Sequence, residues 1–216
     1  MFQIDEVIVI YLIYTIGYPE FPINEFLDVI KHYGIDCVID VRSSPFSNYY
    51  SDYNKDALEN ALKQHNILYR NYANEFGARQ TNPAFYSGDI VDFDKFINSA
   101  QFLEGVSKVK KGIERGYTFV LMCAEKDPIK CHRSIMLGKG FSNNGFDVRH
   151  IISRTELESQ KELEERLLEM HHQDRFQLTL FGGEQSDSEL LTDAYKKQNL
   201  AIGYNRNTNI EQGDEE

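Results

Sequence analysis

Short apolar runs rich in β-branched residues alternate with helical stretches along this chain, and this alternation constrains the fold most. The runs Val7–Ile16, Cys37–Val41 and Tyr117–Cys123 indicate strands, and Cys37–Val41 has the nearly all-apolar character of a strand buried on both faces of a parallel sheet. Residues 24–34 and 54–65 place apolar side chains at helical spacing. The sequence therefore predicts an α/β fold, with a mostly parallel sheet and helices on both faces in a Rossmann-like three-layer arrangement.

Three segments with different character divide the chain. Residues 1–152 carry the alternating pattern and are predicted to form the α/β domain. Residues 153–183 begin with a charged helix, and residues 184–216 read as an acidic, flexible tail. Within the first segment we expect a long loop over 73–88. Two further helices are expected at about 93–115 and 129–141, followed by a final strand at 147–152.

Charge and cysteine content narrow the classes of function. The formal net charge is −11, and most of the acidic excess lies after residue 152, so the sequence lacks the broad basic footprint of a nucleic-acid-binding surface. The three cysteines, at positions 37, 123 and 131, are odd in number and irregularly spaced, which favours a reducing compartment over a disulfide framework. The apolar run near the N-terminus is too short to span a bilayer and follows acidic residues, so we expect a cytoplasmic protein without a membrane partner.

The segment from Leu121 to Arg133 carries the strongest indication of chemistry. A buried strand ends at Cys123, a polar turn follows, and a helix is expected to begin near Cys131. Ligands of open α/β sheets bind beyond the carboxyl ends of strands, and helix N-termini there favour anions. A thiol beside His132 and Arg133 is expected to have a lowered pKa. We therefore predict four catalytic residues: Cys123, Glu125, Cys131 and His132.

A second polar segment, Asp40–Pro45, follows another buried strand and should reach the same sheet edge. Arg42 and Arg133 can then converge on a single anion, because a planar guanidinium binds two oxygens at once. Asp40 is expected to orient Arg42. The predicted substrate-binding residues are Arg42, Ser43, Arg79 and Arg133.

Several separated motifs, in order, make the chain resemble the uncharacterised bacterial family DUF488. This resemblance implies a shared fold and site over about residues 14–152, and the family's activity is unknown. The chain differs mildly at Phe76-Gly77, where other members often have two glycines. The motifs are Tyr14–Tyr18, Ile39–Arg42 with Pro45, Glu75–Arg79, Met122–Glu125 with Pro128, Cys131–Arg133, Gly145 and Val148–Ile151.

The strand that ends in Asp40-Val41-Arg42 also resembles rhodanese-type and phosphatase-type domains, which place a cysteine at a strand end with an arginine soon after it. Here Arg133 follows Cys123 by ten residues, which is too far for either compact loop. Neither reaction is transferred to this chain.

The segment Gln177–Phe181 resembles the short peptide by which bacterial DNA replication and repair proteins dock on the sliding clamp. Gln177 would make polar contacts at the edge of a pocket, and apolar side chains would fill it. The predicted partner-binding residues are Gln177, Leu178, Leu180 and Phe181. The alternative is an edge strand, or a segment that packs back on the core.

Our leading hypothesis is an enzyme that acts on an anionic substrate, such as a phosphorylated small molecule, a nucleotide or a nucleic-acid end. A noncatalytic accessory module of DNA metabolism recruited to the clamp, or a small-molecule sensor, are the alternatives. The same thiols can simply be core residues, and the arginines can serve only to hold loops together. The cysteine spacing differs from that of a CxxC knuckle, so the sequence predicts no metal and leaves any cofactor unknown.

Overall fold

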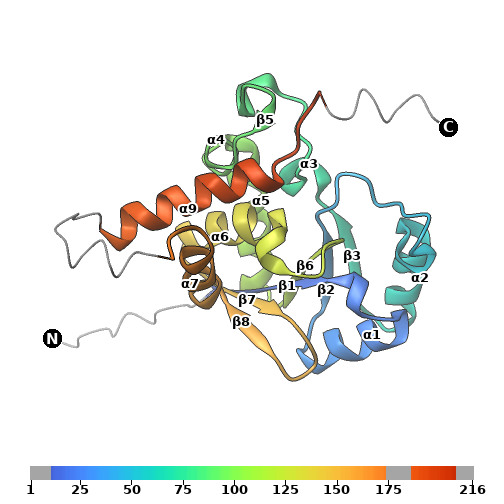
Figure 1. Ribbon diagram of the computed structural model, residues 1–216. Helices are drawn as coiled ribbons and strands as arrows, with labels where there is room; N and C mark the ends of the chain where they lie inside the picture. The colour runs from blue at the N-terminus through green and yellow to red at the C-terminus, as the bar shows by residue number, and fades with distance from the viewer. Residues whose placement is uncertain (1–10, 174–185, 208–216) are drawn as a thin grey trace, which may run out of the picture.

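A six-stranded sheet forms the centre of the molecule, shown in Figure 1 as a computed structural model that describes residues 11–173 and 186–207. The strand order is β3-β2-β6-β1-β7-β8; neighbouring strands are parallel except for β7 and β8, which are antiparallel. The predicted, mostly parallel α/β sheet is confirmed. The strands are β1 (Tyr11–Gly17), β2 (Cys37–Asp40), β3 (Leu68–Asn71), β6 (Phe119–Cys123), β7 (Phe146–Ile151) and β8 (Leu157–Ser159).

Helices cover both faces of this sheet (Figure 1). Helices α1 (Ile23–His32) and α2 (Lys55–Gln64) pack on one face. The other face is covered by α3 (Ala73–Phe76), α4 (Phe93–Ile97), α5 (Ala100–Glu114), α6 (Lys139–Asn143), α7 (Gln160–His171) and α9 (Asp187–Ile202). Within the described ranges, no helix is long and apolar enough to cross a bilayer.

The two hydrophobic cores follow from the period of two along each strand. In β2, Cys37 and Ile39 face the larger core, whereas Val38 faces the core beneath α1 and α2. All of these side chains are at most 1% exposed. A strand whose apolar side chains point to both faces needs both faces covered, which explains why β2 lies inside the sheet, between β3 and β6.

Helix caps and turns divide two stretches of the chain that the sequence pattern predicts to be single elements. The helix expected at about 93–115 is two helices, because Asp92 caps α4 and Ser99 caps α5 by accepting a hydrogen bond from a backbone N–H. The expected loop over 73–88 contains α3, the 3₁₀ turn η3 (Pro83–Phe85) and the strand β4 (Tyr86–Ser87), which forms a hairpin with β5 (Ile90–Val91).

The helix expected over 129–141 is also divided. It begins as the 3₁₀ turn η4 (Pro128–Lys130), and Cys131 then has an extended conformation. A π-helical segment, η5 (Arg133–Gly138), leads into α6. Single π-helical turns are rare and frequently occur at functional sites, so this departure directs attention to the residues around Cys131.

The expected flexible tail over 184–216 is wrong for residues 186–207. Ser186 and Glu189 form a capping box at the start of α9, and Leu190, Ala194 and Tyr195 are buried against the larger core. The acidic composition of residues 184–216 led us to expect a flexible tail, although these three residues lie at helical spacing. In Figure 1, α9 (red-orange) lies across the helices of that face, and it contacts α7.

A buried hydrogen-bond chain ties β1, β7, α7 and α9 together. His150 contacts Thr15 Oγ1 through Nδ1 at 2.8 Å and Gln160 Oε1 through Nε2 at 2.9 Å. The amide of Gln160 in turn donates to Tyr195 Oη at 2.8 Å. An amide oxygen only accepts, so Nε2 of His150 must donate and Nδ1 of the neutral ring accepts from the Thr15 hydroxyl. Burial, with a contribution from the Arg133 charge, lowers the pKa of His150 to about 3.

This depressed pKa predicts a specific loss of stability in acid. The unfolded chain binds a proton at His150 below about pH 6.5 while the folded chain does not, so stability falls as pH decreases from 6.5 towards 3. Between pH 6.5 and 5 the wild type should lose about 2 kcal/mol more unfolding free energy than His150→Gln, at about 1.4 kcal/mol per pH unit. Urea unfolding at several pH values measures the difference. Parallel pH profiles for the two proteins would contradict the buried, neutral histidine.

Candidate functional site

The carboxyl ends of β1 and β6 lie side by side at a topological switch point. Gly17, the last residue of β1, is paired in register with Cys123, the last residue of β6. The chain leaves β1 through α1 on one face and leaves β6 through α6 on the opposite face. Two neighbouring strands whose connections diverge in this way create a crevice, and open α/β sheets bind their ligands there.

A buried arginine shapes the turn that follows β6. The guanidinium of Arg133 is 0% exposed and donates from Nη1 to the carbonyl oxygen of Glu125 and from Nη2 to that of Lys126, the latter at 2.8 Å. Gly17 permits this close approach, because a Cβ atom there would lie 2.0 Å from the Glu125 oxygen. The turn therefore needs both the arginine and the absence of a side chain at position 17.

The four predicted catalytic side chains converge at this turn. One carboxylate oxygen of Glu125, Oε2, lies 2.9 Å from Cys123 Sγ and 2.8 Å from Cys131 Sγ. His132 Nδ1 lies 3.6 Å and 3.9 Å from the same two sulfur atoms. Both thiols and the imidazole are buried, whereas Glu125 has exposed surface. The sequence placed these residues in one segment, and the fold brings their reactive atoms into one cluster.

The protonation states within this cluster are strongly coupled. Burial raises the pKa of Cys123, and it also raises that of Glu125, with Cys131 adding to the latter effect. For Cys131, burial opposes ionisation, but the hydrogen bond from Cys123 and the charges of Arg133 and His132 outweigh it and lower the pKa. The pKa of His132 is raised, because its contact with Cys131 outweighs the cost of burial. The charges around the Cys131 thiol therefore favour its ionisation.

The arginines predicted to bind substrate are largely engaged by the protein. Arg42 is 5% exposed and forms a bidentate pair with Asp40, with Nε–Oδ1 at 2.9 Å and Nη2–Oδ2 at 2.6 Å. These two contacts orient Arg42 as expected. Asp40 also accepts a hydrogen bond from Tyr69. In the described part of the chain, Arg42 Nη1 and Arg133 Nε lack a hydrogen-bond partner.

The other two predicted substrate-binding residues lie on neighbouring loops. Arg79 is exposed, with its guanidinium 5.2 Å from the centre of the Tyr204 ring. The Ser43 hydroxyl accepts a hydrogen bond from the backbone N–H of Arg79 at 2.9 Å, which joins the two loops. Substrate binding by these residues stays a prediction. The four residues of the clamp-like peptide, Gln177, Leu178, Leu180 and Phe181, lie outside the described ranges.

A pocket of about 580 Å³ lies beside the turn that follows Glu125. Lys126, Asp127 and Pro128, which directly follow Glu125, form one side of it. Arg166 and Glu158 line it from α7 and β8, and Arg166 forms ion pairs with both Asp127 and Glu158. Its lining contains none of the four side chains of the cluster.

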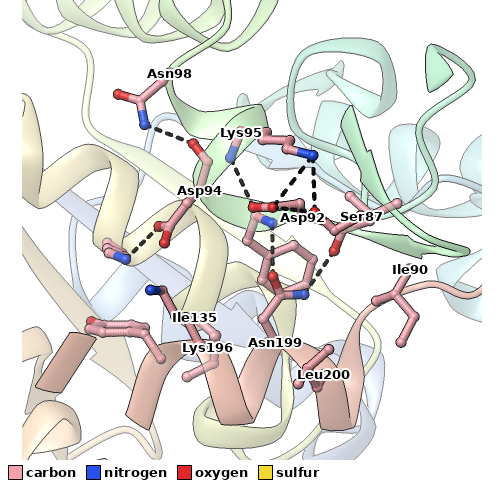
Figure 2. Close-up of a pocket in the computed structure, with 14 residues that line it drawn as sticks. Ser87, Ile90, Asp92, Asp94, Lys95, Asn98, Ile135, Lys196, Asn199 and Leu200 are labelled. Atoms are coloured by element: carbon pink, nitrogen blue, oxygen red, sulfur yellow. Dashed lines mark hydrogen bonds and ion pairs between the residues drawn. The ribbon is translucent and has the colours of Figure 1, made fainter. Parts of the chain in front are cut away.

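Figure 2 shows a second pocket of about 580 Å³, between α9, α4 and the β4–β5 hairpin. Its polar groups are hydrogen-bonded to each other: Asn199 accepts from the backbone N–H of Phe93, and Lys139 pairs with Asp94 at 2.5 Å. Ile135, from η5, contributes to its lining, which contains none of the predicted catalytic residues. We place the candidate site at the thiol cluster, because the four predicted catalytic side chains converge there.

Sequence reasoning missed two residues that support the site. Gly17 lies within the motif Tyr14–Tyr18, but nothing in that motif indicates how closely the Glu125 carbonyl oxygen approaches it. Gln198, in the segment expected to be a flexible tail, is buried and donates to the carbonyl oxygen of Ile129 at 2.7 Å. It thereby holds the η4 turn that precedes Cys131. The capping pattern at Ser186 and Glu189 was the available signal for this helix.

The fold and the cluster define a Rossmann-like α/β protein with a Cys/His/Glu centre at the carboxyl edge of its sheet. A family model described as "Domain of unknown function DUF488" matches residues 22–138. The chain belongs to the DUF488 family. Comparison with curated proteins and with solved structures gave no match.

The buried pair of Asp40 and Arg42 gives a prediction with an internal control. Asp40→Asn should lower the unfolding free energy by about 3 kcal/mol or more, because it leaves a buried guanidinium without its counter-charge. Asp147 and Arg149 form a pair with the same sequence spacing, but their side chains are 35% and 41% exposed. Asp147→Asn should cost less than about 1 kcal/mol. Chemical denaturation of both variants measures the difference, and equal losses would show that Arg42 does not depend on Asp40.

Proposed function

We propose that this DUF488 protein is an enzyme that acts on an anionic substrate at the crevice beyond β1 and β6. The observation that carries the proposal is the convergence of Cys123, Glu125, Cys131 and His132 within 4.8 Å of one another at the switch point of the sheet. A structural core seldom buries two thiols, an imidazole and a carboxylate against each other, since their mutual desolvation is costly. Functional sites collect such groups.

Glu125 is the group that we assign as general acid or base. Its carboxylate contacts both thiols, yet the residue has exposed surface and directly precedes Lys126 and Asp127, which line a pocket. A proton donor or acceptor must reach both the reacting groups and the substrate, and Glu125 has this position. The buried thiols are less accessible to direct attack on a substrate.

The arginines support the anionic character of the substrate. The Arg42 guanidinium pairs with Asp40, and Val41, the residue before it, contacts His132 through its carbonyl oxygen. Arg42 Nη1 and Arg133 Nε have unused hydrogen-bonding capacity towards the described residues. The exposed guanidinium of Arg79 lies on a neighbouring loop and offers a further cation. A phosphate or carboxylate group would use such donors.

A substrate screen with matched glutamate variants tests this function. The protein is incubated with a panel of phosphorylated and carboxylated metabolites, nucleotides and short oligonucleotides, and products are followed by mass spectrometry. Glu125→Gln should reduce turnover by about 100-fold or more, which is typical for loss of an acid–base group. Glu156→Gln, at the exposed rim of the adjoining pocket, should leave turnover nearly unchanged. Tight binding without turnover would replace the enzyme with a sensor, and equal effects of the two variants would remove Glu125 from the chemistry.

A second proposal concerns recruitment. The clamp-like peptide Gln177–Phe181 lies between α7 and α9, both of which pack on the larger core. We propose that it binds the bacterial sliding clamp, which would bring the domain to sites of DNA replication or repair.

Direct binding to a purified bacterial sliding clamp tests recruitment. The intact protein should bind with micromolar affinity or tighter, and Gln177→Ala with Phe181→Ala should weaken binding by about 100-fold, the effect of losing two anchor side chains. Thr179→Ala, between the anchors, serves as the control and should have little effect. Calorimetry or surface plasmon resonance gives the affinities, and an intact protein that does not bind would remove the proposal.

A further inference from the structure

The thiol cluster has the donor set and the geometry of a metal site. Its four donor atoms come from two segments of the chain. Cys123 ends β6 and Glu125 lies two residues beyond it, whereas Cys131 and His132 directly precede the π-helical segment η5. All four lie within 4.8 Å of one another. Two sulfurs, one ring nitrogen and one carboxylate oxygen are the ligands that zinc accepts in tetrahedral sites. Spacing along the chain gave no hint of this, because it differs from a CxxC knuckle.

We propose that Cys123, Cys131, His132 and Glu125 bind a divalent transition-metal ion of the zinc class. Thiolate and imidazole ligands select borderline and soft metals over magnesium or calcium, which prefer oxygen. The sequence-based expectation of no metal rested on linear spacing, whereas this proposal rests on the positions of the donor atoms.

The orientation of His132 is that of a ligating histidine. Its Nδ1 faces both sulfurs, while Nε2 lies 3.3 Å from the carbonyl oxygen of Val41. A carbonyl oxygen can only accept, so Nε2 carries a proton, and in the neutral ring the lone pair of Nδ1 points into the cluster. Metal-ligating histidines characteristically donate their second ring N–H to a carbonyl or carboxylate in this way.

The surroundings of Cys131 fit a metal-bound thiolate. The backbone N–H of Arg133 points at Cys131 Sγ at 3.4 Å, a contact that favours negative charge on sulfur. Two thiolates and a carboxylate carry three negative charges, so a divalent ion leaves one in excess. The buried guanidinium of Arg133 lies beside the cluster and can balance it.

A disulfide between the two cysteines is the competing use of this cluster. Its formation requires the sulfurs to approach to about 2.05 Å. In the structure, Glu125 Oε2 contacts both sulfurs, at 2.9 Å and 2.8 Å, and both cysteines are free. The contact of both sulfur atoms with one oxygen of Glu125 suits ligands arranged around a metal ion better than two cysteines positioned to form a disulfide.

The burial pattern indicates which ligand can exchange. Cys123, Cys131 and His132 are buried, whereas Glu125 has exposed surface. Catalytic zinc sites keep three protein ligands and an open position, and two cysteines with one histidine are a known set. Glu125 would then be the ligand that substrate or water replaces, and it could serve as an acid or base towards that substrate or water. This inference deepens the proposed function, but metal binding itself is measurable without any substrate.

Metal titration of the full-length, tag-free protein tests the proposal. Chelator-treated protein is titrated with Co²⁺, then with Zn²⁺ in competition with a chromophoric chelator, under reducing conditions. We expect about one ion per chain, with the intense visible bands and sulfur-to-cobalt charge transfer of a tetrahedral thiolate site. Zn²⁺ should also raise the unfolding temperature, because it binds the folded state.

Cysteine variants give the matched control. Cys131→Ser and Cys123→Ser should each lose the charge-transfer band and weaken Zn²⁺ binding by about 100-fold or more, the loss expected when a ligand is removed. Cys37→Ala should bind as the wild type does, since Cys37 is equally buried but lies outside the cluster. Circular dichroism confirms that each variant is folded. Glu125→Gln changes the one proposed ligand that has exposed surface, so it leaves the buried ligands in place. A wild type that binds no ion, or binding that is unchanged in both Cys131→Ser and Cys123→Ser, would overturn the proposal, whether or not the protein proves to be an enzyme.

Discussion

The buried guanidinium of Arg133 is the interaction on which the arrangement of the site depends. A fully buried arginine is expensive unless its N–H groups find partners, and here the partners are the carbonyl oxygens of Glu125 and Lys126. These hydrogen bonds close the turn after β6 over Gly17, which has no side chain to obstruct it. Since Arg133 immediately follows Cys131 and His132, the same contacts bring the second half of the cluster back to Cys123.

Sheet topology determines where this turn can act. The order β3-β2-β6-β1-β7-β8 places β6 between β2 and β1, so the ends of three parallel strands carry Arg42, Cys123 and Gly17 at one edge. The chain then leaves β6 and β1 on opposite faces. The crevice is a consequence of connectivity, and the polar residues lie there because their strands end there.

The C-terminal helix is part of the domain that supports the site. Gln198 of α9 donates to Ile129, and Tyr195 joins the chain of hydrogen bonds that passes through Gln160 to His150. These contacts couple the turn before Cys131 to β7 and α7. A chain that ended after β7 would keep the four clustered side chains but lose this support, so we expect α9 to contribute to the order of the cluster as well as to stability.

The sequence by itself determined the α/β class, the parallel sheet and the identity of the polar residues at the strand ends, because apolar periodicity and strand-terminal motifs are local properties. It also predicted the Asp40–Arg42 pair, since residues two apart at a strand end can meet. Only the tertiary structure decided that Cys123, Glu125, Cys131 and His132 share one centre, that Arg42 and Arg133 are already engaged, and that α9 packs on the core. Those outcomes depend on strand order and on π-helical and 3₁₀ turns, which bring together atoms that linear spacing keeps apart.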